Sequence, residues 1–279
     1  MSQTPDTSPQ LPTIAFIGGG NMASAIIGGL IHRGHLASQI EVVEPWAEAR
    51  EALRKTYGIQ AQSEAGPALQ RAQIVVWAVK PQTFKDAAAQ ARPHTADALH
   101  LSVAAGIRSD SIAQWLGSER IVRTMPNTPA LVGKGMSALY ARPSVSAPER
   151  QSIEAIMATT GDFLWVDDEP LLDAVTALSG SGPAYVFYFL EAMTRAGTGM
   201  GLTAAQAHQL AVGTFVGASE LARRSDETPA VLRQRVTSKG GTTYAAIQSM
   251  EHDAVGDKFV HAMQAARQRA HELGDEFGK

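Results

Sequence analysis

Short apolar runs alternate with segments of helical spacing over the first 167 residues. Short runs of mostly apolar residues predict buried strands, and segments whose apolar residues lie three or four positions apart predict helices. The predicted helices cover residues 22–30, 46–55, 84–91 and 148–160, and a short extended piece lies near Ile59. The predicted strands cover residues 14–17, 40–43, 74–79, 99–103, 120–125, 136–140 and 163–166. This alternation predicts an α/β fold with a mainly parallel sheet.

The pattern changes after Asp167, beyond which only helical spacing remains. Pro183 stands in the first turn of a predicted helix over residues 185–195, and Thr203 is the predicted N-cap of a long helix that ends near Arg224. Thr228 and Pro229 mark the start of another helix. We therefore predict a polar, disordered tail at residues 1–11, an α/β domain at residues 12–167 and an all-helical domain at residues 168–279.

Composition excludes several classes of function. The formal net charge of −3 and the pI near 6.2 provide no basic field for nucleic acid or for an anionic membrane surface. The chain contains no cysteine, which excludes disulfides and thiol catalysis and removes the usual ligands of structural zinc. The sequence shows neither a signal peptide nor an apolar run that could span a bilayer, so we expect a cytoplasmic protein.

A glycine-rich turn follows the first predicted strand. Gly18, Gly20 and Ala23 fit the pattern G-x-G-x-x-A, in which small residues let the backbone approach a pyrophosphate at a helix N-terminus. A purely structural turn is the alternative, because glycine-rich turns are common. The position between a strand and a helix favours the nucleotide, so we predict a Rossmann-type, doubly wound, mainly parallel sheet followed by an all-α C-terminal domain.

Glu44 stands at the end of the second predicted strand. An acidic residue at this place accepts hydrogen bonds from the adenosine ribose and repels a 2′-phosphate, so Glu44 favours NADH over NADPH. The alternative is a solvated glutamate at a strand end, and the nearby Arg50 and Arg54 would favour a phosphate. The sequence leaves the choice between NADH and NADPH open.

Three further strand ends carry small residues or proline, where loops that bind a ligand are expected. These are Lys80-Pro81, Ala104-Ala105-Gly106 and the PNTP segment at residues 126–129. Ligands of open parallel sheets collect at the carboxyl ends of the strands. The strand ends therefore agree with the glycine-rich turn in predicting one binding edge.

A second candidate site lies in the helical half, in the segment VTSKGGTT at residues 236–243. Hydroxyl groups and glycine amides converge there at the N-terminus of a predicted helix over residues 244–250, which is a geometry that binds a carboxylate. The alternative is a simple N-cap formed by Ser238 or Thr242. The segment is not a phosphate-binding P-loop, because Lys239 precedes the glycines.

Six motifs together resemble the pyrroline-5-carboxylate reductase family. LSGSGPAY followed by VTSKGGTTYAAI is the most specific combination, and the resemblance extends from about Pro12 into the C-terminal helices. The other four motifs are IGGGNMA, AVKPQ, VAAG and RTMPNTP. The resemblance implies hydride transfer from NAD(P)H to the imine carbon of 1-pyrroline-5-carboxylate, which gives L-proline in the last step of proline biosynthesis.

The resemblance also implies which residues form the site. Ser238, Gly240, Gly241 and Thr242 correspond to the loop that holds the substrate carboxylate, and Thr243 corresponds to the hydroxyl that faces the ring nitrogen. The implied cofactor-binding residues are Ile17, Gly18, Gly19, Gly20, Asn21, Met22, Ala78, Val79, Lys80, Pro81, Val103, Ala104 and Ala105. Residues 63–66 lack an asparagine that relatives often carry near the adenosine, and Glu44 replaces a residue that is often small or polar.

Two other functions remain open. A 3-hydroxyacid dehydrogenase of the 6-phosphogluconate dehydrogenase type needs a basic residue on the first long helix of the helical half, and residues 184–195 contain no lysine or histidine. A nucleotide-sensing module without turnover would have no use for the hydroxyl-rich segment at residues 236–243, which we call the hydroxyl loop.

No metal site is predicted, because the histidines and carboxylates show no ligand spacing. The resemblance implies a homodimer built through the helical halves, with a decamer possible, and small residues such as Ala211, Gly213, Gly217 and Ala218 suit close helix contact within the domain or between subunits.

Overall fold

The structure of the protein is a computed structural model, which describes residues 11–278. Two compact units are present. Within the described residues, the sheet unit comprises residues 11–181 and 266–278, and the helical unit comprises Gly182–Ala265. We expected a boundary after Asp167 and none within the last helix. The predicted tail at residues 1–11 lies, except for Leu11, outside the described residues.

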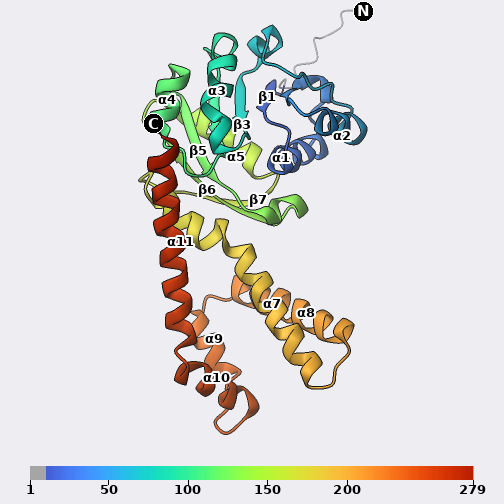
Figure 1. The fold of residues 1–279 in the computed structure, drawn as a ribbon, viewed down its shortest axis with the longest axis vertical. Helices are drawn as coiled ribbons and strands as arrows, with labels where there is room; N and C mark the ends of the chain where they lie inside the picture. The colour runs from blue at the N-terminus through green and yellow to red at the C-terminus, as the bar shows by residue number, and fades with distance from the viewer. Residues whose placement is uncertain (1–10, 279) are drawn as a thin grey trace, which may run out of the picture. The chain divides into compact units, whose positions relative to one another are not determined.

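The sheet unit contains a seven-stranded sheet in the order β2-β1-β3-β4-β5-β6-β7 (Figure 1). All neighbouring strands are parallel except β5 and β6. The strands are β1 (Ile14–Ile17), β2 (Ile40–Val43), β3 (Ile74–Trp77), β4 (Leu99–Ser102), β5 (Ile121–Met125), β6 (Gly135–Ala141) and β7 (Gly161–Trp165). An additional parallel bridge joins Val43 to Gln62, so the chain near the predicted extended piece adds to the sheet beyond β2.

Helices connect the strands of this unit. The α-helices are α1 (Asn21–His32), α2 (Ala47–Tyr57), α3 (Pro81–Ala91), α4 (Ser109–Leu116), α5 (Ala147–Met157) and α6 (Leu171–Val175). Short 3-10 helices are η1 (Ala37–Gln39), η2 (Pro67–Arg71), η3 (Arg92–His94) and η4 (Thr128–Val132), and a π-helix, η5 (Thr176–Gly180), follows α6. Pro81, which we expected only to end a strand, is the first residue of α3. Proline is tolerated there because the backbone N–H of a first helical residue has no partner within the helix. The short helix α4 was not predicted from the sequence.

Alternate residues of β1, β2, β3 and β5 enter two separate cores. Ile14 and Phe16 pack with apolar residues of α1, α2 and α5 on one face, while Ala15 and Ile17 pack with α3 and α4 on the other. A sheet covered by helices on both faces needs strands that are apolar throughout, which is why β1 to β3 contain hardly any polar residues. The predicted fold class is confirmed.

The helical unit consists of helices with little buried surface of their own. It contains α7 (Gly182–Gly199), α8 (Ala204–Arg224), α9 (Pro229–Arg235), α10 (Thr242–His252) and the first part of α11 (Val255–Phe277). Thr203 and Thr228 cap α8 and α9 as predicted. Only Gly197, Ala207 and Ala211 are buried among residues 182–265. The unit leaves many large apolar side chains exposed, including Phe187, Tyr188, Leu210, Val216 and Leu221.

Within residues 11–278, no helix is both long and apolar enough to cross a membrane.

A buried histidine should make the stability of the sheet unit depend on pH. His100 on β4 is 1% exposed, and its Nδ1 accepts a hydrogen bond from Trp77 Nε1 at 3.1 Å. Burial, with a smaller contribution from the charge of Arg120, lowers the pKa of His100 to about 4. The folded protein thus holds neutral histidine, whereas the unfolded chain binds a proton below its usual pKa of about 6.5. Stability should therefore fall as the pH falls from about 6.5 to 4.

Urea unfolding at a series of pH values tests this expectation. The difference in free energy of unfolding between pH 7.5 and pH 4 should be larger in the wild type than in His100→Gln, by as much as about 3 kcal/mol. The variant serves as the control for carboxylates that titrate in the same range. Equal pH dependence in the two proteins would contradict the expectation.

Candidate functional site

The carboxyl ends of β1, β2 and β3 meet at the glycine-rich turn. The amide of Gly18 donates to the carbonyl of Val43 at 2.8 Å, and the amide of Ala78 donates to the carbonyl of Ile17 at 2.8 Å. The chain leaves β1 toward β2 on one side and later returns to β3 on the other, so the turn lies where the strand order reverses. Such a switch point is where open α/β sheets bind ligands.

The three glycines of the turn have different structural requirements. Gly18 has φ +97°, and a Cβ there would lie 2.5 Å from the carbonyl oxygen of Ala78. A Cβ on Gly19 would lie 2.8 Å from Leu53 Cδ1. Gly20 is exposed, has φ −73° and would place a Cβ in open space. The fold itself therefore requires a glycine at position 18. At position 20 a side chain would meet no protein atom, so the absence of a Cβ leaves open space beside the turn.

Helix α1 begins beside that free space with unsatisfied amides. Its N-cap is Gly20, and no side chain caps it. The first amides of an α-helix have no partner within the helix, and the dipole of the helix is positive at this end. Asn21 is exposed and Met22 is half-buried at the same place. The turn can thus bind an anion such as a pyrophosphate.

Glu44 is buried and is bonded to this turn. Its side chain, in a residue only 6% exposed, accepts the amide of Gly19 at 2.7 Å and the amide of Trp46 at 2.9 Å. The alternative of a solvated glutamate is wrong. Arg50 donates to the carbonyls of Glu44 and Pro45, and Arg54 pairs with Glu51 at 2.7 Å, so both arginines already have partners.

The other residues proposed for the cofactor lie at the same edge of the sheet. Ala78 and Val79 follow β3 and are half-buried, Lys80 is exposed, and Pro81 begins α3. Val103 follows β4 and donates its amide to the carbonyl of Trp77 at 3.1 Å. Ala104 is buried and Ala105 is half-buried. The structure therefore places all the predicted cofactor residues, from Ile17 to Ala105, at neighbouring strand ends.

The hydroxyl loop of the helical unit also precedes an uncapped helix. Gly240 has φ +76°, which favours glycine, and the amide of Gly241 donates to the carbonyl of Ser238 at 3.0 Å. Gly241 is the N-cap of α10, and no side chain caps it. The alternative in which Ser238 or Thr242 caps the helix is therefore wrong.

The hydroxyls of Ser238, Thr242 and Thr243 accordingly make no hydrogen bond to other described residues, and all three residues are exposed. By contrast, Thr237 donates its hydroxyl to the carbonyl of Arg233 at 2.6 Å. Ser238, Gly240 and Gly241 in the loop, with Thr242 and Thr243 in the first turn of α10, thus present hydroxyls and helical amides that are available to an anionic ligand.

The RTMPNTP motif, whose PNTP segment was predicted to lie at the binding edge, is joined to the LSGSGPAY motif inside the sheet unit. Asn127 Nδ2 donates to the carbonyl and to Oγ of Ser179, both at 3.2 Å, and Asn127 Oδ1 accepts the amide of Met136 at 2.9 Å. Ser179 belongs to the π-helix, a rare element that is frequent at functional sites. Only spatial proximity reveals this pair, because 52 positions separate the two residues.

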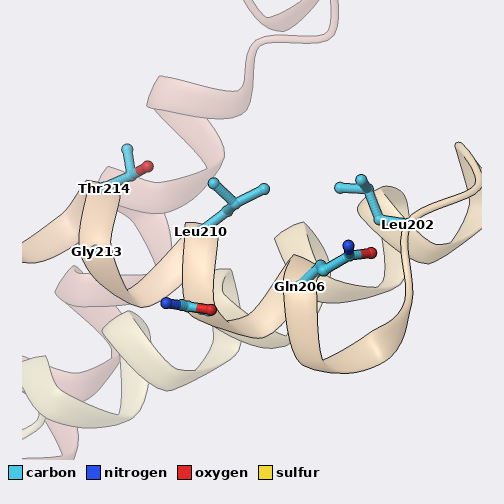
Figure 2. A pocket seen from close by; sticks show the side chains of 6 residues that line it. Leu202, Gln206, Leu210, Gly213 and Thr214 are labelled. Carbon is cyan, nitrogen blue, oxygen red and sulfur yellow. The ribbon is translucent and has the colours of Figure 1, made fainter.

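A separate hollow of about 620 Å³ lies along α8 and contains none of the predicted site residues. It is lined by Leu202, Gln206, Gln209, Leu210, Gly213 and Thr214. Figure 2 shows Leu202, Leu210 and Thr214 projecting to the same side of this segment. Apolar and amide side chains provide no group for acid–base chemistry, so the hollow is a surface feature of the helical unit rather than a reaction centre.

The part of the chain that the structure describes contains no group of three or more histidine, aspartate or glutamate side chains arranged to hold a metal ion.

Comparison with known proteins identifies both halves of the chain. A family described as pyrroline-5-carboxylate reductase dimerisation matches residues 169–273, and one described as NADP oxidoreductase, coenzyme F420-dependent, matches residues 13–106. Pyrroline-5-carboxylate reductase of Pseudomonas aeruginosa is 43% identical over 270 residues, which cover 96% of this chain and 99% of the relative. The chain belongs to the pyrroline-5-carboxylate reductase family.

Solved pyrroline-5-carboxylate reductases have the same fold. The structure of the enzyme from Coxiella burnetii matches with a TM-score of 0.88 and 36% identity, over 95% of this chain and 99% of that one. The Plasmodium falciparum enzyme, solved with NADP bound, matches with a TM-score of 0.85 and 27% identity, over 94% and 98% of the two chains.

This chain is therefore an NAD(P)H-dependent oxidoreductase of proline biosynthesis that acts on an imine. Its helical half contains the dimerisation domain of the family, so the protein assembles into an oligomer. The two alternatives from the sequence, a 3-hydroxyacid dehydrogenase and a nucleotide sensor, are not supported.

Proposed function

We propose that the hydroxyl loop of the helical unit binds 1-pyrroline-5-carboxylate while the glycine-rich edge of the sheet unit binds NAD(P)H. The single observation that carries this proposal is the uncapped N-terminus of α10, surrounded by hydroxyls that have no partner among the described residues. A helix N-terminus with free amides and a positive dipole attracts a carboxylate. The substrate is a small ring whose only fixed negative charge is its carboxylate.

Each residue of the loop has a distinct task in this proposal. Ser238 and Thr242 donate their hydroxyls to the carboxylate oxygens, and the backbone around Gly240 and Gly241 approaches the carboxylate closely because these residues carry no Cβ. Thr243 places its hydroxyl beside the ring nitrogen. These contacts fix the position of the imine carbon, and such alignment can supply several kcal/mol of the barrier reduction.

The reaction itself needs little chemistry from the protein. Bound NAD(P)H supplies a hydride, which adds to the imine carbon while the nitrogen keeps or gains one proton and becomes the secondary amine of proline. A protonated imine already accepts hydride readily, so the chain needs no strong acid. The absence of lysine and histidine from α7 agrees with this, because oxidation of an alcohol would require a base.

In the sheet unit, we propose that the cofactor is bound by the residues at the carboxyl ends of β1, β3 and β4. The amides of Gly20, Asn21 and Met22 face the pyrophosphate, and Ile17, Gly18 and Gly19 shape the turn. Residues 78–81 and 103–105 line the path from the pyrophosphate toward the nicotinamide. The arrangement of these segments at neighbouring strand ends supports the assignment.

We propose that the enzyme prefers NADH because of Glu44. The carboxylate is buried at the end of β2, where it would repel a 2′-phosphate, and Arg50 and Arg54 are already engaged with other partners. With 1-pyrroline-5-carboxylate as substrate and proline identified as product, kcat/KM should be higher for NADH than for NADPH. In Glu44→Gln, which lacks the charge, the ratio of the two values should fall about tenfold.

Glu48→Gln is the matched control for this experiment. It removes an exposed charge from the first turn of α2 and should leave the ratio unchanged. A wild-type preference for NADPH, or an unchanged ratio in Glu44→Gln, would remove the role of Glu44 but keep the reductase. If neither cofactor is oxidised by folded protein, the proposed reaction is wrong.

We further propose that residues 12–167 form the dinucleotide-binding domain and that residues 168–279 form the substrate-binding and dimerisation domain. The helical unit buries only three of its residues and leaves Phe187, Tyr188 and Leu221 exposed, which supports a homodimer through this part. The molar mass in solution, measured by light scattering, should be at least twice 29.6 kDa. A mass ten times that value would indicate a decamer, and a monomer would contradict the proposal.

We place the reaction in the cytoplasm, where a biosynthetic reductase has access to reduced nicotinamide cofactors. Detection of the protein in the soluble cytoplasmic fraction of cells would agree with this, and its recovery in another compartment would contradict it.

A further inference from the structure

Trp46 is a large aromatic residue whose backbone is held by hydrogen bonds while its side chain is open to solvent. It is 71% exposed, although an indole is mostly apolar. Its backbone is held on both sides, since its amide donates to Glu44 Oε1 at 2.9 Å and its carbonyl accepts the amide of Arg50 at 3.1 Å. Arg50 also donates to the carbonyl of Pro45 at 2.7 Å. The segment that presents the indole is therefore rigid.

The position of Trp46 relates it to the glycine-rich turn. One carboxylate, that of Glu44, accepts the amide of Gly19 through Oε2 and the amide of Trp46 through Oε1. The turn and Trp46 are thus hydrogen-bonded to the same side chain at the carboxyl end of β2. No strand lies between them, because β1 and β2 are adjacent in the sheet.

We propose that the indole of Trp46 is the stacking surface for the adenine ring of the cofactor. This inference rests on the proposed cofactor site, in which the adenosine ribose lies at Glu44. Adenine is bonded directly to that ribose, so the base reaches the residues that follow Glu44. An exposed and rigid aromatic ring stacks on a base at little cost in conformational entropy, and such stacking is typically worth a tenfold or greater change in affinity.

Stacking and charge make separable contributions at this end of the cofactor. The indole contacts the base and not the 2′ position, so it should strengthen binding of NADH and NADPH by the same factor. Glu44 should instead change the ratio between the two cofactors. Trp46 is therefore a binding residue for the adenine and not a determinant of cofactor choice.

Binding of cofactor fragments to the purified full-length chain tests the proposal. Calorimetry should show that Trp46→Ala weakens binding of ADP-ribose and NADH by about tenfold or more, while Trp46→Phe stays within about threefold of the wild type. Binding of reduced nicotinamide mononucleotide, which lacks adenine, should be the same in wild type and Trp46→Ala. Leu36→Ala is the matched control, because Leu36 is 63% exposed and precedes β2 at the opposite end of the strand.

Two results would overturn the proposal. The first is unchanged affinity of Trp46→Ala for ADP-ribose. The second is an equal loss of affinity for ADP-ribose and for reduced nicotinamide mononucleotide, which would show that the residue supports the fold of the turn and not the base. Calorimetry with ADP-ribose needs no turnover, so a failure of the proposed reaction would be recognised separately, by the absence of proline formation in the wild type.

Discussion

Thr243→Val is expected to lower kcat/KM for 1-pyrroline-5-carboxylate by about 100-fold. Valine has nearly the same shape as threonine, so the change removes the hydroxyl and little else. The hydroxyl has no partner among the described residues and lies in the first turn of α10. We propose that it faces the ring nitrogen, where a lost hydrogen bond to the reacting group typically costs about 100-fold or more in rate. Steady-state kinetics with varied substrate measure the effect.

Thr198→Val is the control for Thr243→Val. Thr198 is exposed on α7, and its hydroxyl bonds to the carbonyls of Thr194 and Arg195, so its loss should not change catalysis. Thr243→Ser, which keeps a hydroxyl, should recover most of the activity, and NADH affinity should be the same in all three variants. Activity of Thr243→Val within about threefold of the wild type would exclude the proposed role.

Gly18→Ala is expected to lower the stability of the protein, whereas Gly20→Ala is expected to lower only its affinity for the cofactor. At Gly18 the added Cβ would lie 2.5 Å from the carbonyl oxygen of Ala78, on a residue with φ +97°. Gly18→Ala should therefore destabilise the protein by about 3 kcal/mol or prevent folding, because both strain and overpacking contribute. At Gly20 the added Cβ meets no protein atom, and φ is −73°. Gly20→Ala should fold normally.

Cofactor binding should nevertheless be weakened in Gly20→Ala. The proposed pyrophosphate occupies the space that the missing Cβ leaves free, so the affinity for NADH should fall about tenfold to a hundredfold. Thermal unfolding and NADH titration of both variants distinguish the two effects. Normal NADH binding by Gly20→Ala would show that the pyrophosphate does not approach this glycine. A stability of Gly18→Ala equal to that of the wild type would show that the turn can relax.

The two groups of proposed site residues are supported by different structural observations. The cofactor residues lie at neighbouring strand ends, as the topology of a doubly wound sheet requires. The proposed substrate residues lie in one loop and in the first turn of the uncapped helix that follows it. The experiments on Thr243, Gly20 and Trp46 address these two groups separately, so one can fail while the other holds.

The local elements and the family could be predicted from the sequence because their signals lie within a few residues. Apolar runs mark strands such as Ile40–Val43, and Thr203 and Pro229 mark helix starts, since burial and capping depend on near neighbours. The glycine spacing of residues 18–23 predicts the nucleotide-binding turn for the same reason. The short helix α4 was missed because its one or two turns give too little periodicity.

Long-range contacts were decided only by the tertiary structure. The hydrogen bond of Glu44 to Gly19 depends on strand pairing between β1 and β2, and the link between Asn127 and Ser179 joins residues 52 positions apart. The last helix likewise returns to the sheet unit, where Gly274 lies against Arg108 and Ser111 donates to the carbonyl of Gly278 at 2.8 Å. The sequence by itself determined most of the helices and strands and the family to which the chain belongs. Only the tertiary structure decided which groups are buried together, because burial and hydrogen bonding between distant segments depend on how the elements pack and not on their spacing along the chain.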